Sequence, residues 1–131
     1  MISTKYTKEI IVKEDDIDEL NHVNNVRYVQ WIQDISKDHW FSSIKGKLST
    51  PYIWVVASHF IEYKSSALLN DELSIETYVE KFEGAMSYRH VEIKNSKTNR
   101  IIVKALTKWC LIDFKTKKSK QIPSEILELE F

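Results

Sequence analysis

The most polar stretch of the chain is also the stretch best suited to chemistry. Carboxylates, one imidazole and three carboxamides stand within the ten residues from Asp16 to Asn25, a density that core packing does not require. A helix is predicted to begin directly after them, and a helix N-terminus exposes unpaired N–H groups and a partial positive charge that stabilise an oxyanion. With the N–H near Asn25 directed at a carbonyl oxygen, a carboxylate earlier in the loop would attack the carbonyl carbon or activate a water.

Two less specific interpretations account for the same residues. Asp and Asn before a helix often cap its N-terminus or form turns, and Asp16 is interpreted as such a structural loop carboxylate. The spacing of Asp16 and Asp18 also begins like a calcium-binding loop. That loop would need a turn glycine, which is missing, and a closing bidentate Glu, where this chain has Arg27.

The polar stretch lies between a predicted strand and a predicted long helix. Residues 6–13 are rich in β-branched side chains, which favour a strand. Residues 26–44 have helical periodicity, with polar side chains on one side and a broad apolar stripe on the other. The stripe consists of Tyr28, Val29, Trp31, Ile32, Ile35 and Trp40. A stripe of this width requires a surface that curves around the helix.

The second half of the chain supplies that surface. Strands are predicted at residues 52–64, 73–82, 85–94 and 100–114, with turn residues between the later ones. Short connections imply an antiparallel sheet, and packing one helix against one of its faces hides both apolar surfaces. The tail, residues 122–131, is expected to form a short amphipathic helix after Pro123. Without repeats or linkers, residues 1–131 are expected to form a single domain of the α+β class.

Composition restricts the classes of partner and compartment. The chain has 131 residues, and its 19 basic residues balance 19 acidic ones, so no global field attracts nucleic acid or an anionic membrane. Residues 1–10 alternate polar and apolar side chains and are expected to be neither a signal peptide nor a membrane span. The lone Cys110 cannot form an intramolecular disulfide, which favours a reducing, cytoplasmic compartment.

Eight residues with fixed spacing carry a resemblance to a known family. They are Asp16, Asp18, His22, Val23, Asn24, Asn25, Tyr28 and Trp31. This pattern resembles the signature of hotdog-fold thioesterases of the 4-hydroxybenzoyl-CoA thioesterase type, and His-Val-Asn-Asn is similar to a segment of acyl-CoA and plant acyl-carrier-protein thioesterases. The order of the predicted elements agrees with that family over nearly the whole chain. The resemblance implies a hotdog fold, in which a five-stranded antiparallel sheet wraps a long central helix.

The resemblance also implies roles for particular residues. Asp18 stands at the position of the catalytic carboxylate, a general base or nucleophile, and Asn25 at the helix start, whose backbone N–H polarises the thioester oxygen. His22 matches a histidine that orients water or substrate in some members. Contacts with substrate are expected from Asn24, Tyr28 and Trp31. The sequence departs from the family at Asn21, where Gly is usual, at Leu20, where the plant enzymes have Asn, and at Gln33, where many bacterial members have Glu.

Other candidate residues receive structural interpretations. His59 and His90 fall in strand patterns and are expected to be packed or on the surface, and Cys110 is expected to be an inert thiol. Trp31, Trp40, Trp54 and Trp109 are assigned to the core or to the lining of an acyl tunnel. Residues 115–120 are basic and are expected to form a solvated connection. Near the site mouth, their lysines would attract coenzyme A phosphates or an acidic acyl carrier protein.

The expected activity is hydrolysis of an acyl thioester, acyl-CoA or acyl-carrier protein, without a metal or redox cofactor. The acyl chain is expected in a tunnel between helix and sheet, with Asp18 and a water at the carbonyl. A homodimer or homotetramer is expected, since an uncovered sheet edge in a small domain favours pairing. Two alternatives remain: a module that binds acyl-CoA without turning it over, and a hotdog dehydratase, which would need an imidazole aligned with its substrate.

Overall fold

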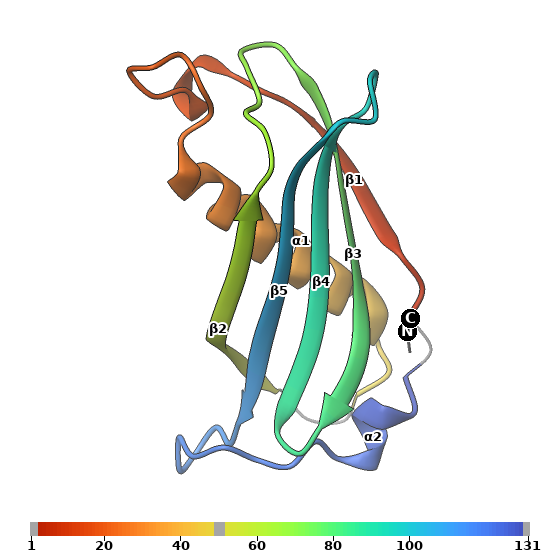
Figure 1. Ribbon diagram of the computed structural model, residues 1–131. Helices are drawn as coiled ribbons and strands as arrows, with labels where there is room; N and C mark the ends of the chain where they lie inside the picture. The colour runs from red at the N-terminus through yellow and green to blue at the C-terminus, as the bar shows by residue number, and fades with distance from the viewer. Residues whose placement is uncertain (1–2, 49–51, 130–131) are drawn as a thin grey trace.

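The computed structural model describes residues 3–48 and 52–129, and within them it has one long helix on one face of an antiparallel sheet (Figure 1). The expected domain limits at residues 1 and 131, the first two residues of the N-terminal segment and the last two of the tail lie outside the described residues. The elements are β1 (Tyr6–Ile11), a 3₁₀ turn (Glu14–Asp16), α1 (Asn25–Ile44), β2 (Ile53–Tyr63), β3 (Glu72–Glu83), β4 (Met86–Asn95), β5 (Ile101–Ile112) and α2 (Ser124–Leu127).

The predicted architecture is confirmed: a strand, a long helix and four strands follow one another in the order expected of a hotdog fold. The five strands form one sheet in the order β1-β3-β4-β5-β2, and every neighbouring pair is antiparallel. Strands β3 and β4 form a hairpin at Gly84, whose φ of 62° suits glycine because it lacks a Cβ. The short helix after Pro123 is also present, as α2, and it buries Ile126.

The apolar stripe of α1 forms the main core, as its periodicity predicted. Tyr28, Ile32 and Ile35 are each at most 2% exposed, and they belong to one cluster with inward-facing residues of the sheet. Those sheet residues include Leu73, Ile75, Val91, Ile93, Ile102 and Val103. Trp40, farther along the helix, packs instead against a second cluster around Leu111 and Ile126. The first half of α1 is therefore held tightly against the sheet.

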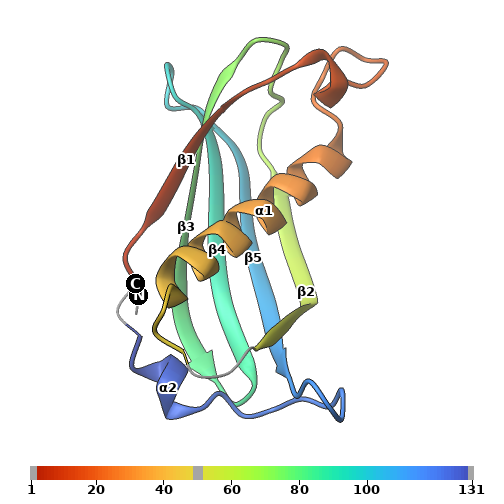
Figure 2. The same ribbon diagram turned by 180° about the vertical axis from the view of Figure 1, so that it is seen from behind.

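Helix α1 crosses the sheet diagonally (Figure 2). Its N-terminal end lies toward β2, and its C-terminal end lies toward β3 and the short helix α2. The backbone of α1 makes its nearest approaches to β1 and β3. In its second half α1 reaches β2 through Trp40, whose ring meets that of Trp54 edge-to-face with centroids 5.5 Å apart. In the described part of the chain, no helix is both long and apolar enough to cross a membrane.

Candidate active site

Asp16 holds the two ends of the polar loop together. Its carboxylate accepts the Lys13 N–H at 2.8 Å and forms an ion pair with Arg27 Nε at 3.0 Å. Its backbone carbonyl accepts the N–H of Asn24 at 2.9 Å. Asp16 thus joins the end of β1 to the start of α1, in the structural role expected of it. The Arg27 that stands where a calcium ligand would be is the partner of this carboxylate.

Asp18 is fixed through one oxygen of its carboxylate. Oδ1 accepts the N–H groups of Leu20 at 2.8 Å and His22 at 3.3 Å, and the Asp18 N–H donates to the His22 carbonyl at 2.8 Å. Within residues 3–48 and 52–129, no group donates a hydrogen bond to Oδ2. Asp18 is half-buried, so this second oxygen is held in a defined position while remaining available to another partner.

The departure at Asn21 has a physical explanation. The φ of Asn21 is 63°, a left-handed backbone that Gly adopts without strain and that Asn tolerates better than other residues. The turn also places the Asn21 N–H on the Asp18 carbonyl at 3.1 Å. Asn21 therefore adopts the left-handed backbone that this turn requires, and Gly could adopt it as well.

The start of α1 leaves one backbone donor available. The Asn24 side chain caps the helix by accepting the Val26 N–H at 2.9 Å, and the Asn24 carbonyl accepts the Arg27 N–H at 2.8 Å. The N–H of Asn25 has no acceptor among the described residues. Both Asn24 and Asn25 are exposed. A helix terminus of this kind can donate to an oxygen that develops negative charge.

Tyr28 joins the helix and the polar loop to a second loop, which follows β2. The Tyr28 hydroxyl accepts the Ala67 N–H at 2.9 Å, and the Ala67 carbonyl accepts the N–H of Val23 at 3.0 Å. Burial raises the pKa of Tyr28, and the nearby charge of Asp18 adds a smaller increase. His22 pairs with Leu68 through an isolated backbone bridge, and its side chain is exposed. These contacts make Tyr28 a positioning residue beneath the loop.

Trp31 lies beside Tyr28, with ring centroids 5.7 Å apart in an edge-to-face arrangement. It is half-buried and packs against the main core. The six residues singled out from the sequence therefore fall in two layers. Asp18, His22, Asn24 and Asn25 form the loop and helix start, and Tyr28 and Trp31 support them from the core side.

Tyr28→Phe is expected to destabilise the protein by about 1–3 kcal/mol, because the buried Ala67 N–H loses its acceptor while the ring remains. Urea unfolding of the variant measures this free energy. Tyr88→Phe on β4 is the matched control, since the structure gives the Tyr88 hydroxyl no hydrogen bond to a described residue. Equal stability of Tyr28→Phe and the unmutated protein would contradict the anchoring role.

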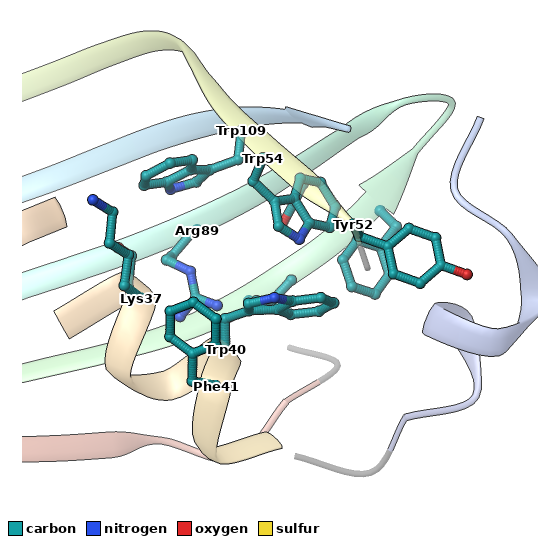
Figure 3. A pocket seen from close by; sticks show the side chains of 11 residues that line it. Lys37, Trp40, Phe41, Tyr52, Trp54, Arg89 and Trp109 are labelled. Carbon is teal, nitrogen blue, oxygen red and sulfur yellow. The ribbon is translucent and has the colours of Figure 1, made fainter. Parts of the chain in front are cut away.

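Two cavities are relevant to the predicted acyl tunnel. A hollow of about 210 Å³ at the helix start is lined by Asp15, Asn24, Val26, Arg27 and Gln30. A second cavity, of about 150 Å³, lies between the second half of α1 and the sheet (Figure 3). It is lined by Ser36, Lys37, Trp40, Phe41, Tyr52, Trp54, Val79, Phe82, Ser87, Arg89 and Trp109. Neither cavity includes Asp18 or Asn25, so the tunnel remains a prediction.

The basic segment after β5 is far from Asp18 in the same chain. The loop of Asp18 lies beside Ala67, near the start of β5, whereas residues 115–120 follow the end of β5. Figure 1 shows the two segments at opposite ends of the sheet. Within one chain, these lysines therefore do not lie near the mouth of the proposed site.

Across the described ranges, no group of three or more His, Cys, Asp and Glu residues is arranged to hold a metal.

Sequence reasoning missed a buried polar cluster around Arg89. Arg89 is 5% exposed and contacts His39, which is 3% exposed, on α1. The sequence did contain a signal for its burial, because Arg89 falls in the same inward alternation of β4 as the buried Val91 and Ile93.

His59 is half-buried, and its Nδ1 forms a hydrogen bond with Thr107 Oγ1 at 2.7 Å. Burial lowers the pKa of His59.

Comparison with known proteins assigns the chain to a family. The model of the family described as "Acyl-ACP thioesterase N-terminal domain" matches residues 3–129. No curated protein matches the chain.

Solved structures share the fold at low sequence identity. YbaW, a probable thioesterase from Escherichia coli, has a TM-score of 0.81 and 23% identity, with 93% of each chain covered. A mutant of 4-hydroxybenzoyl CoA thioesterase complexed with 4-hydroxybenzoyl CoA has a TM-score of 0.83 and 12% identity, covering 95% of this chain and 96% of that one. The 12:0-ACP thioesterase from Umbellularia californica has a TM-score of 0.81 and 14% identity, covering 93% of this chain and 48% of that one.

Proposed function

The chain belongs to the family of acyl-ACP thioesterase N-terminal domains, and from this membership we propose that it hydrolyses an acyl thioester carried by coenzyme A or by acyl carrier protein. Its family makes it a thioesterase, which is a hydrolase. We propose Asp18 as general base or nucleophile, the Asn25 N–H as oxyanion donor, and His22 and Asn24 as side chains near the water and substrate.

The observation that carries this proposal is a pair of groups without partners among the described residues, one in the polar loop and one at the start of α1. Asp18 Oδ2 accepts no hydrogen bond from the described residues, and the Asn25 N–H donates none to them. A carboxylate oxygen in this state can take a proton from water or attack a carbonyl carbon. The N–H and the helix dipole would stabilise the negative charge on the carbonyl oxygen. Loss of one such donor typically lowers the rate about a hundred- to thousand-fold.

Thiol release from a series of acyl-CoAs of increasing length, and from the same acyl groups on acyl carrier protein, tests the proposal. Hydrolysis with a length preference would support it and identify the carrier. Saturable binding of acyl-CoA with no thiol release would support the non-catalytic binding module instead. Addition of water to an enoyl thioester, without hydrolysis, would identify a dehydratase.

We propose further that two copies pair through the edge of β2. On this edge strand Val55, Phe60 and Tyr63 are 39%, 65% and 46% exposed, whereas the exposed side chains of the other edge, β1, are mainly polar. Exposed apolar side chains on an open strand edge favour pairing with another chain. Tyr63 lies on the helix side of this edge, where it contacts Tyr28, and Leu20 and Leu68 are exposed in and beside the loop of Asp18. A second copy there would shield the site from water.

Phe60→Glu is expected to shift the protein from a dimer to a monomer, because a charge would replace the most exposed apolar side chain of the edge. Light scattering coupled to size exclusion measures the mass. Thr7→Glu, on the opposite edge strand, introduces the same charge and should leave the assembly unchanged. A monomeric unmutated protein would refute the pairing, and a tetramer would show that a second interface exists.

A further inference from the structure

The cavity beneath the second half of α1 has walls of an unusual composition. Six aromatic side chains line it: Trp40, Phe41, Tyr52, Trp54, Phe82 and Trp109. The charged side chains that line it are Lys37 and Arg89, and none of its lining residues is acidic. In Figure 3, Trp54, Trp109 and Arg89 project from the sheet toward Trp40 and Lys37 of α1. The walls of the cavity are therefore mainly apolar, and the charged side chains that line it are cations.

Arg89 carries a buried charge that no carboxylate of residues 3–48 or 52–129 neutralises. Its Nη1 donates to His39 Nδ1 at 2.8 Å and to Thr77 Oγ1 at 3.1 Å, and both acceptors are neutral groups. His39 is neutral because burial and the charge of Arg89 lower its pKa to about 4. Nε and Nη2 of Arg89 donate to no residue within 3–48 or 52–129. Burial of an ion without a counter-ion is strongly unfavourable, and an anion in the cavity would offset that cost.

Two indole N–H groups of residues that line the same cavity also lack hydrogen-bond acceptors among the described residues. Nε1 of Trp54 and Nε1 of Trp109 are buried, and neither has a hydrogen-bond partner in the described structure. Trp109 is 8% exposed, and the two residues lie on the paired strands β2 and β5, where both line the cavity. A buried donor without an acceptor is destabilising. A ligand with acceptor atoms that reached these donors would satisfy them, as it would the guanidinium.

We propose that this cavity binds a small organic carboxylate, with its oxygen atoms on Arg89 and the two indole N–H groups and its apolar body against the aromatic walls. A cavity of 150 Å³ has the size of one that accommodates benzene in other proteins. A benzoate-sized acid is therefore the ligand class that matches its volume, its donors and its charge. Arg binds carboxylates well because its planar donors match their geometry.

The carboxylate has two possible sources. Asn25 and Trp40 are 15 positions apart in one helix, a distance of about 22 Å. A fatty acyl tail in a membrane spans roughly half of the ~30 Å hydrocarbon core, or about 15 Å. The length of such a tail is therefore of the same order as the distance from Asn25 to Trp40. The ligand is either the distal carboxylate of a long acyl thioester or a free acid. The site itself follows from the donors in the cavity and does not depend on the role of Asp18.

Titration of the full chain with benzoate, followed by tryptophan fluorescence and calorimetry, tests the site. Benzyl alcohol is the matched neutral probe. Benzoate is expected to bind at least about tenfold more tightly than benzyl alcohol, as charge-assisted hydrogen bonds predict. Benzoate that binds no better than benzyl alcohol would overturn the proposal. Since this experiment involves no hydrolysis, its failure is distinct from failure of the thioesterase assignment.

Three variants assign the binding to the cavity. Arg89→Met removes the charge but keeps an unbranched side chain, and it should abolish the preference for benzoate. Trp109→Phe keeps an aromatic ring and removes one donor, so benzoate affinity should fall about three- to tenfold while benzyl alcohol affinity is unchanged. Arg100→Met changes the net charge equally at an exposed position and should have no effect. If Arg89→Met does not fold, the benzoate affinity of Trp109→Phe becomes the deciding measurement. An affinity equal to that of the unmutated protein would overturn the proposal.

A kinetic comparison separates the two sources. Hexadecanedioyl-CoA and hexadecanoyl-CoA differ only in the distal carboxylate. A higher kcat/KM for hexadecanedioyl-CoA that disappears in Arg89→Met would support the site and identify the carboxylate as part of the substrate. Equal kcat/KM values, together with Arg89-dependent benzoate binding, would support the site as one for a free acid.

Discussion

Asp18→Asn is expected to lower kcat for acyl thioester hydrolysis by a factor of about 10²–10⁴, the usual contribution of a general base. An amide can neither accept a proton from water at neutral pH nor act as the proposed nucleophile. The variant should remain folded, because the Asn oxygen can still accept the N–H groups of Leu20 and His22 that Asp18 Oδ1 accepts. Thiol release with a saturating acyl-CoA measures kcat, and circular dichroism monitors the fold.

Asp15→Asn is the matched control for this prediction. Asp15 lies in the same loop and is exposed, and it contacts Arg27 through its backbone carbonyl, which the substitution leaves in place. It should therefore keep nearly the full rate. Rates equal to those of the unmutated protein in Asp18→Asn would remove Asp18 from the site and return the loop to a purely structural role.

The stability of the protein is expected to decrease as the pH falls from about 6.5 to 4. His39 has a pKa of about 4 in the folded protein, against 6.5 as its ordinary value, because of burial and the neighbouring charge of Arg89. The unfolded chain therefore binds a proton that the folded chain does not, so acid favours unfolding. A pKa decrease of this size corresponds to roughly 3 kcal/mol of stability, present above pH 6.5 and lost near pH 4.

His39→Gln isolates this contribution, since a Gln oxygen can accept from Arg89 Nη1 and does not titrate. Urea unfolding at several pH values should show that the variant loses roughly 3 kcal/mol less than the unmutated protein between pH 7 and pH 4. His22→Gln, at an exposed loop position, should keep the full pH dependence. Parallel pH profiles for His39→Gln and the unmutated protein would contradict the assignment.

The fold followed from the sequence because local and long-range signals agreed. The spacing of Tyr28, Ile32 and Ile35 selected one face of a helix, and this face is the one buried against the sheet. The alternation in residues 73–82 placed Leu73 and Ile75 inward. The Asn24 cap fixed the helix start within one residue of the predicted position.

The site was less predictable, since it depends on distances between segments that the sequence does not give. Capping and catalysis both require polar residues before a helix, and only the hydrogen bonds distinguish Asp16, which is fully occupied, from Asp18, which has one free oxygen. The lysines of residues 115–120 carried a suitable charge, but β5 takes them to the far end of the sheet. Arg89 had inward alternation, but nothing local indicated that it would lack a carboxylate partner among residues 3–48 and 52–129.

The left-handed turn at Asn21 gives a rule for recognising this loop in other chains. Three residues after the carboxylate at position 18, the backbone φ of 63° admits Gly, and Asn with little strain, whereas most other residues would lose about 1–2 kcal/mol. A search pattern that demands Gly there would overlook this chain. Asn21→Gly should be tolerated, and an aligned relative with Val or Ile at this position would need a differently shaped loop.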